Sequence, residues 1–355
     1  MCNNPSQTPV KRLMKAAMYY SLDNIIIQDM PIPKISANEI LVMMKACGVC
    51  GSDLMEWYLK TRTPLVLGHE PSGVVAKVGG KVEGFEEGDR VFAHHHVACL
   101  TCHYCRHDAY TLCEQFVHTH LEPGGFAEYF RVPAPNLQTD TLKIPPELSF
   151  EEATLIEPVG CCLRALNKCS IQAADSAVVV GAGPSGIVLT MLLRIFGASQ
   201  IIVTDFVNYR LKAARSLGAD LTVNPESESL IDVIKKATDG RGADLVIVTA
   251  PNVNAYLAGL ELCRRGGTLC IFAPTQHEDF MRLSPNKLFF SEIKLVPSYS
   301  TSHIETRTAL KLIQAGRIDA KKLITHRFPL TKTAEAFQMA ARSKECLKVV
   351  VLNER

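Results

Sequence analysis

The stretch AVVVGAGPSG, residues 177–186, decides the fold of this chain. A short apolar run typical of a buried strand leads directly into a turn containing Gly181, Gly183 and Gly186, and a helical pattern follows to about residue 196. In a G-x-G-x-x-G turn the first glycine permits the tight bend, the second lets a pyrophosphate approach the backbone, and the third lets helix and strand pack closely. Pro184 and Ser185 complete the loop, where the pyrophosphate would meet the positive end of the helix. The stretch therefore predicts a dinucleotide-binding strand, turn and helix.

The next apolar run, residues 201–204, ends at Asp205, which has the spacing from the glycine turn expected of a ribose-binding acid. A carboxylate can accept hydrogen bonds from both ribose hydroxyls. It would repel a 2′-phosphate by about 4 kcal/mol per charge pair at ~4 Å and an effective dielectric near 20, so NAD is favoured over NADP. Arg210 keeps NADP open, because an arginine near the acid can receive that phosphate; its other role is to lie along the adenine or in solvent.

Two patterns of secondary structure surround this stretch. After about residue 158, β-branched runs alternate with helical segments, which indicates a parallel sheet covered by helices on both faces. From Lys15 to about Val132 short alternating runs are separated by Gly, Pro and charged turns, the pattern of a β-rich antiparallel domain. A chain of 355 residues favours two domains. We expect the final apolar run, residues 346–352, to rejoin the first domain, and we predict the fold class to be α/β.

A frame of closely spaced cysteines lies between these patterns, with spacing C-x2-C-x2-C-x7-C: Cys99, Cys102, Cys105 and Cys113. Four thiolates at such spacing can bind one zinc ion tetrahedrally, and a complete ligand set leaves no position for substrate. Disulfides are an alternative, as is an iron–sulfur cluster, whose bacterial spacing differs at the last ligand. The chain has thirteen cysteines, and its first fourteen residues lack an apolar export segment, so we expect a reducing, cytoplasmic location. The frame therefore predicts a structural zinc.

A second set of metal-binding residue types is spread along the chain: Cys50, His69, Glu70 and Glu157. A catalytic zinc needs about three such ligands and one open position. These residues lie in motifs whose order resembles that of the zinc-dependent medium-chain dehydrogenases, particularly the branch of sorbitol, other polyol and threonine dehydrogenases. The motifs are CGSD (50–53), GHE (68–70), the four-cysteine frame, EP (157–158) and GAGPSG (181–186).

The resemblance implies a GroES-like catalytic domain and a Rossmann domain. We assign residues 1–14 to a loose leader, 15–162 and 300–355 to the catalytic domain with its zinc lobe at about 94–116, and 163–299 to the Rossmann domain. It also implies that Cys50 and His69 bind the catalytic zinc, with either Glu70 or Glu157 as third ligand.

The resemblance further implies a proton relay that begins at Ser52 and includes a histidine three residues later, but this position is Met55. A thioether cannot carry a proton at neutral pH. The proton would leave through ribose hydroxyls and water, or another histidine would substitute. Strand alternation would turn His94 and His96 to one face and His95 to the other. We hypothesise that one of them, His95 or His96, faces the active cleft and handles substrate or proton; a hydrogen-bonded structural triplet is the alternative. The resemblance puts these residues in the pocket wall, where any could equally be core: Met55, Trp57, Phe116, His118 and Ser300.

Together these features predict an enzyme that oxidises a secondary hydroxyl of a polyol, sugar or related small molecule with NAD and two zinc ions, one catalytic and one structural. A simple secondary-alcohol or threonine-type dehydrogenase is the nearest alternative. A non-catalytic NAD-binding module that is stabilised by a structural zinc is an alternative from another class. The net charge is +2 without a basic run, so neither nucleic acid nor a membrane is expected as partner. Family analogy predicts a homodimer or homotetramer.

Overall fold

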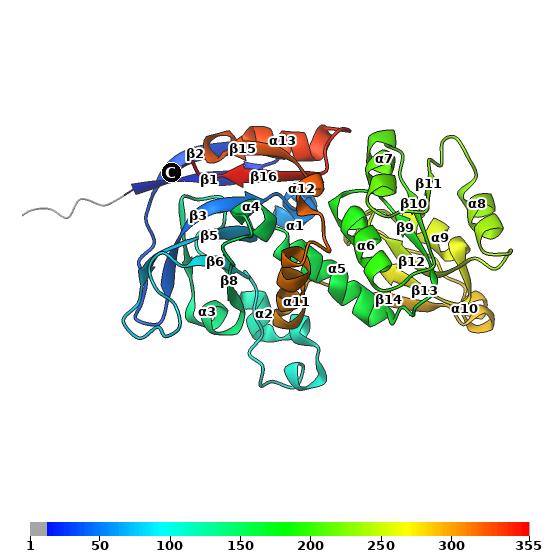
Figure 1. The fold of residues 1–355 in the computed structure, drawn as a ribbon, viewed down its shortest axis with the longest axis horizontal. Coiled ribbons are helices and arrows are strands. Elements are labelled where there is room, and N and C mark those ends of the chain that lie inside the picture. Colours follow the sequence, from blue (N-terminus) through cyan, green and yellow to red (C-terminus); the bar gives the residue numbers. More distant parts are fainter. Residues whose placement is uncertain (1–12, 355) are drawn as a thin grey trace, which may run out of the picture.

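The computed structural model describes residues 13–354, whose strands form three sheets (Figure 1). The smallest sheet has the order β2 (Asn24–Pro31), β1 (Leu13–Ser21) and β4 (Leu65–Val66). Residues 1–12 of the predicted leader lie outside the described residues. Leu13 and Met14, its last two residues, already belong to β1, so the strand begins two residues earlier than the predicted boundary.

The dinucleotide-binding half is a six-stranded parallel sheet, as the alternating pattern predicted. Its order is β11 (Leu221–Val223), β10 (Gln200–Thr204), β9 (Ser176–Val180), β12 (Ala243–Val248), β13 (Cys263–Ile271) and β14 (Lys294–Pro297). The helices of this half are α6 (Pro184–Ile195), α7 (Asn208–Ser216), α8 (Leu230–Ala237), α9 (Val253–Leu262) and α10 (Pro285–Ser291). The chain leaves β9 in one direction and returns to its other side at β12, so the glycine turn lies at the switch point where open sheets of this kind bind ligands.

The other half is a seven-stranded, mostly antiparallel sheet. It contains β15 (Ile324–Pro329), β16 (Lys348–Leu352), β3 (Ile40–Gly48), β5 (Glu70–Val78), β6 (Arg90–Ala93) and β8 (Thr141–Lys143), with β7 (Tyr129–Val132) also paired to β3. The final strand β16 pairs antiparallel with β3, which is the predicted return of the chain to its first part. The fold class is therefore α/β, with a GroES-like and a Rossmann-like part, as predicted.

One helix connects the two halves. α5 (Ile156–Cys169) runs from the strand-rich half toward the parallel sheet, and α11 (His303–Gln314) packs against it (Figure 1). A single buried cluster contains Phe92 of β6, Leu163 of α5 and Val179 of β9, so the apolar core continues across the predicted boundary at residue 162. The exact division into 15–162, 163–299 and 300–355 stays a proposal.

The remaining elements are short. The α-helices are α1 (Glu56–Leu59), α2 (Glu114–His118), α3 (Ala134–Asp140), α4 (Phe150–Ala153), α12 (Ala320–Leu323) and α13 (Thr333–Arg342). The 3-10 turns are η1 (Gly51–Leu54), η2 (Cys105–His107), η3 (Tyr110–Leu112) and η4 (Leu330–Lys332). Within residues 13–354, none of the helices combines the length and the apolar character needed to cross a bilayer.

Candidate functional site

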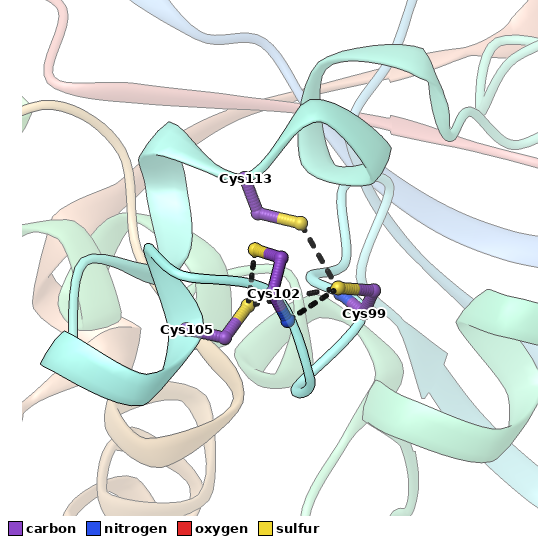
Figure 2. Close-up of side chains that lie close together, drawn as sticks. All are labelled: Cys99, Cys102, Cys105 and Cys113. Atoms are coloured by element: carbon purple, nitrogen blue, oxygen red, sulfur yellow. Dashed lines mark hydrogen bonds between the residues drawn. The ribbon is translucent and has the colours of Figure 1, made fainter.

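The four-cysteine segment folds into a lobe around its own sulfur atoms, which Figure 2 shows turned toward one another. All four sulfurs lie within 4.8 Å of one another; the Cys102 and Cys105 sulfurs are 3.5 Å apart, and those of Cys99 and Cys105 are 3.9 Å apart. A tetrahedron with metal–sulfur bonds of ~2.3 Å has edges of about 3.8 Å. These residues therefore fit a zinc ion with four thiolate ligands.

The surroundings of the lobe cysteines shift the pKa values of two of their thiols in opposite directions. Hydrogen bonds from Thr101 and from the backbone lower the pKa of Cys99 to about 6, which favours the thiolate that a metal requires. Burial raises the pKa of Cys105 to about 12, so its proton would be released when the ion binds. Most of the bonds at Cys99 come from its own turn, and the four possible ligands all lie within residues 99–113.

The second predicted ligand set comes together where β3 and β5 end. Gly48 of β3 pairs with Glu70 of β5, which brings the chain after β3, at Cys50, beside His69 and Glu70. One ligand atom from each of Cys50, His69 and Glu70 lies within 4.8 Å of the other two. A Cβ at position 48 would collide with the Glu70 carboxylate, so the close approach requires glycine.

Asp53 positions two of these donors, and the sequence argument did not single it out. Its Oδ2 accepts a hydrogen bond from the Cys50 backbone N–H at 3.0 Å, and its Oδ1 lies 3.3 Å from His69 Nδ1. A carboxylate on Nδ1 leaves Nε2 of a histidine free to bind a metal. Burial alone would lower the pKa of His69, but Asp53 and Cys50 raise it well above its usual value. The detectable signal was an acid three residues after the cysteine of CGSD.

Lys348 is a second contributor that the sequence argument missed. Its Nζ lies 2.7 Å from Oε1 and 2.5 Å from Oε2 of Glu70, and it donates to the Val49 carbonyl at 2.9 Å. Both side chains of the ion pair are buried. Burial raises the pKa of Glu70, and the ammonium of Lys348 offsets part of that effect. A lysine inside the apolar run 346–352 was the only signal in the sequence.

Glu157, the other predicted third ligand, groups with two histidines instead. One ligand atom from each of Glu157, His94 and His95 lies within 4.8 Å of the others. The His95 ring lies 4.9 Å from the His69 ring, between centroids, so this group adjoins the set of Cys50, His69 and Glu70. Which carboxylate is the direct third ligand stays open between Glu70 and Glu157.

The three consecutive histidines have different partners. β6 ends at Ala93, so the expected strand alternation does not apply to them. His94 Nδ1 lies 2.9 Å from Asp140, and His96 Nδ1 bonds the Thr119 carbonyl at 2.6 Å. Burial holds the pKa of His95 well below its usual value and lowers that of His96 to about 3, so both rings are uncharged at neutral pH. Groups of this kind act as ligands or hydrogen-bond partners more readily than as proton acceptors.

The glycine turn joins β9 to α6. Gly181 has φ +106°, and a Cβ at Gly186 would collide with the Gly181 carbonyl. A Cβ at Gly183 would meet no described protein atom within 4 Å, which leaves room for a pyrophosphate at the start of α6. Asp205 follows β10; its Oδ2 accepts from the Ala182 N–H, and its Oδ1 accepts from the Val207 N–H, both at 2.8 Å. Pro184, Ser185 and Arg210 lie in the first turns of α6 and α7.

The predicted pocket residues occupy different environments. Phe116 is buried with the lobe cysteines, and its ring packs 5.1 Å from that of His96. His118 is exposed and lines a hollow of about 500 Å³ beside the lobe. Trp57 is half-buried, with its ring 5.2 Å from that of His277.

Three further predicted residues lie at turns. Ser52 belongs to η1, and its carbonyl accepts a hydrogen bond from the Met55 N–H at 3.2 Å. Ser300 has φ +56° and follows Tyr299, whose ring lies 6.3 Å from that of Phe116. Their roles in binding or proton transfer stay predictions.

Known proteins match this chain over nearly its whole length. Residues 36–145 match the family described as "Alcohol dehydrogenase GroES-like domain", and residues 184–315 match "Zinc-binding dehydrogenase". A sorbitol dehydrogenase of Bacillus subtilis (strain 168) is 34% identical, with 98% of this chain and 99% of that protein covered. An L-threonine 3-dehydrogenase of the same organism is 31% identical, with 92% and 94% covered. The solved structure of alcohol dehydrogenase TADH from Thermus sp. ATN1 is similar with a TM-score of 0.86 and 28% identity, covering 96% of this chain and 100% of that one.

Proposed function

The chain belongs to the zinc-dependent medium-chain dehydrogenases, and we propose that it transfers hydride from a secondary hydroxyl of a polyol, sugar or related small molecule to NAD⁺. The observation that carries this proposal is that one helix, α5, carries a predicted metal donor and also contacts the nucleotide turn. Glu157 and Cys162 both belong to α5, and the Cys162 sulfur donates to the Ser185 carbonyl of the glycine loop at 3.6 Å. The helix that carries Glu157 thus also contacts the loop where the dinucleotide would bind. We call the region of the donors Cys50, His69, Glu70, His94, His95 and Glu157 the cleft.

The chain's own residues have distinct roles in this proposal. Cys50 and His69 would hold the zinc, with Glu70 or Glu157, and Asp53 would fix the orientation of His69. When bound, such an ion acidifies a hydroxyl group. Ser52 would accept the alcohol proton, and Met55 cannot pass it on. His95 and His96 are uncharged, so we assign them to orienting substrate hydroxyls while the proton leaves through ribose and water.

Relatives with different substrates leave alternatives within the same reaction type. The matched proteins include sorbitol and threonine dehydrogenases at similar identity, and a simple secondary alcohol is a further alternative. The polar side chains around the predicted zinc ligands, with the rings of His69 and His95 4.9 Å apart, favour a substrate with several hydroxyls over a simple aliphatic alcohol. A non-catalytic NAD-binding module is the alternative from another class.

The test is a substrate panel on the holoenzyme with NAD⁺, followed by the absorbance of NADH. The panel contains polyols, inositols, hydroxy amino acids and simple alcohols. We expect the highest kcat/KM for a polyol or inositol, and its loss in Cys50→Ser. Turnover of threonine alone would move the assignment to the threonine branch, and no turnover of any alcohol would favour the non-catalytic module.

Asp205 supports NAD as the cofactor. Its carboxylate is fixed by two backbone N–H groups at the end of β10, where a ribose 2′-phosphate would meet its charge. We expect Asp205→Ser to reduce the preference for NAD over NADP by about a hundredfold or more, since one charge pair is worth about 4 kcal/mol in partly shielded surroundings. The measurement is kcat/KM for each cofactor. An unchanged ratio would show that Asp205 does not select the cofactor.

Assembly and location are part of the proposal. β14 is the outer strand of the parallel sheet, and Phe289 and Phe290 of α10 before it are exposed, which favours pairing of two copies into a homodimer or homotetramer. Sedimentation of the purified chain tests this directly. The cytoplasm, where thiols stay reduced, is the compartment we propose for a chain with thirteen cysteines.

A further inference from the structure

The chain crosses between the two halves of the molecule twice. The first crossing is α5, which leads toward β9, and the second is residues 298–302, which join β14 to α11. The two crossings are in contact, because α11 packs against α5 (Figure 1) and a Cβ at Gly160 of α5 would collide with Thr301. Glu157, a predicted metal donor of the cleft, lies in the first turn of α5. Its position therefore depends on how the crossings are fixed.

The four-cysteine lobe packs against the second crossing through two aromatic contacts. Between ring centroids, Tyr110 of η3 lies 4.8 Å from His303, the first residue of α11, and Phe116 of α2 lies 6.3 Å from Tyr299. Tyr110 and Phe116 also pack with the lobe cysteines in one apolar cluster. The core of the lobe therefore extends to the place where the chain leaves the parallel sheet.

Arg164 of α5 joins the lobe to both crossings. Its Nη2 donates to Thr111 Oγ1 of η3 at 3.4 Å, and its Nη1 lies 3.8 Å from Oε1 of Glu305 in the first turn of α11. All three side chains are buried. The other carboxylate oxygen of Glu305 accepts a hydrogen bond from the Ser302 N–H, at the end of the second crossing, at 3.1 Å. One guanidinium thus contacts the lobe and an acid that is anchored where α11 begins.

Arg164 and Glu157 are seven residues apart in α5, which is close to two helical turns. They therefore project from the same side of the helix, about 10 Å apart along its axis. Among the described residues, Arg164 Nε has no hydrogen-bond partner, so the guanidinium depends on Thr111 and Glu305 for its position. Because a helix is stiff over two turns, a shift at Arg164 also moves Glu157.

We propose that Arg164 is a positioning residue that couples the four-cysteine lobe to Glu157 through α5. Thr111 lies two residues before the lobe cysteine Cys113, so a metal bound by the lobe fixes η3 against Arg164. Without that metal η3 is released, and α5 loses a contact that places Glu157 in the cleft. The lobe then serves hydride transfer as well as stability. This inference rests on the proposed function, because Glu157 matters to the reaction only as a donor of the cleft.

The first test is a double-mutant cycle, measured with NAD⁺ and the best alcohol of the substrate panel. Cys105→Ser disrupts the lobe, and Arg164→Met/Glu305→Gln removes the contact without leaving a charge buried alone. With kcat expressed per NADH-binding site, so that unfolded protein is not counted, we expect each change to lower kcat about tenfold. Combined, they should lower it by about ten- to twentyfold and not a hundredfold, because both act through the same contact.

Matched variants separate the contact from general effects on α5. Thr111→Val removes the hydroxyl that accepts from Arg164, and it should lower kcat by about threefold, whereas Thr111→Ser keeps the hydroxyl and should retain the parent kcat. Lys168→Met removes a charge from an exposed position one turn further along the same helix and should leave kcat unchanged.

The second test does not require turnover. With zinc kept in the lobe and Co²⁺ placed in the cleft, the visible spectrum reports the arrangement of the cleft ligands. We expect this spectrum to shift in Arg164→Met/Glu305→Gln and to match the parent in Lys168→Met. If the parent oxidises no alcohol, the proposed function fails, and the spectrum still decides the role of Arg164. An unchanged spectrum overturns the proposal in every case, and so do losses of kcat that multiply independently where the parent is active.

Discussion

The cysteine lobe and the cleft are both built to hold a metal, but they are assembled in opposite ways. The lobe takes its four ligands from residues 99–113. The cleft takes its donors from the ends of β3 and β5, the chain after β6, and α5, and Lys348 comes from the last strand. A site whose ligands lie close together in the sequence depends little on the rest of the fold. A site assembled from distant strands forms only when those strands pair in the correct register. Stability should therefore respond most to the lobe ligands, and chemistry to the cleft donors.

The largest effect on stability is expected at the lobe. Cys105→Ser removes one of four ligands from a buried position, and zinc binding in small peptides is worth ~10–16 kcal/mol. We expect a loss of about 5 kcal/mol in the free energy of unfolding and about one zinc ion per chain. Thermal unfolding and metal analysis measure both, with Arg106→Ala, at an exposed position of the same lobe, as control. Full stability with one zinc ion lost would mean that the lobe does not depend on its metal.

The next largest effect is expected on turnover in the cleft. Cys50→Ser replaces a predicted zinc ligand at a site with an open position, and metal catalysis supplies several kcal/mol. We expect kcat/KM to fall by about a thousandfold, or about 4 kcal/mol, while the unfolding temperature changes little. Steady-state kinetics and thermal unfolding of the same preparation give both values. Equal losses of stability in Cys50→Ser and Cys105→Ser would break the contrast between the two regions.

A third prediction concerns the ion pair behind the cleft. Lys348→Met leaves the buried Glu70 without its counter-charge, which costs about 3–5 kcal/mol in comparable buried pairs. We expect denaturant unfolding to show a loss of about 3 kcal/mol. The double variant Glu70→Gln/Lys348→Met should recover most of it, because no charge is then buried alone. Lys344→Met, in an exposed position of the same segment, should change stability by less than about 0.5 kcal/mol.

The same contrast explains what the sequence could predict. The glycine turn, Asp205 and the four cysteines were found because each pattern lies within a short stretch or at a fixed spacing. Cys50 and His69 were found only through a family's ordered motifs. Asp53, Asp140 and Lys348 were missed, because a single acid or lysine is usually solvated and these three act through partners set by the fold. Lys348 meets Glu70 across a sequence separation of 278 residues, which only the pairing of β16 with β3, and of β3 with β5, brings about.

The histidine triplet illustrates the limit further. Alternation along a strand was a sound rule for residues inside β6, but the strand ends at Ala93. Beyond it His94 bonds Asp140, His96 bonds Thr119, and the His95 ring lies beside His69; these partners come from three other parts of the chain. The sequence could indicate that histidines gather near the lobe, but not which one would face which partner.

His96 lies between the two regions. The pH dependence of stability caused by this one residue is the smallest expected effect, and it tests whether the lobe and the cleft are in direct contact. Its ring packs 4.0 Å from that of His95 in the cleft and 5.1 Å from that of Phe116 in the lobe. Burial lowers the pKa of His96 to about 3, so the folded chain keeps this ring uncharged while the unfolded chain protonates it below about pH 6.5. The unfolded state therefore binds one more proton between these values, and stability falls as the pH falls through this window, by about 1.4 kcal/mol per pH unit.

His96→Asn removes that proton and keeps a side chain able to bond Thr119. Denaturant unfolding of both proteins at matched pH values should show the native chain losing stability faster on acidification, with the difference growing below about pH 6.5. Contributions of zinc ligands are common to both proteins and cancel in the difference. If the free energy of unfolding of both proteins had the same pH dependence, the His96 ring would be open to solvent. The lobe and the cleft would then be separated by water at this point. A steeper curve for the native chain would mean that the His96 ring stays buried and uncharged where it packs against both His95 and Phe116.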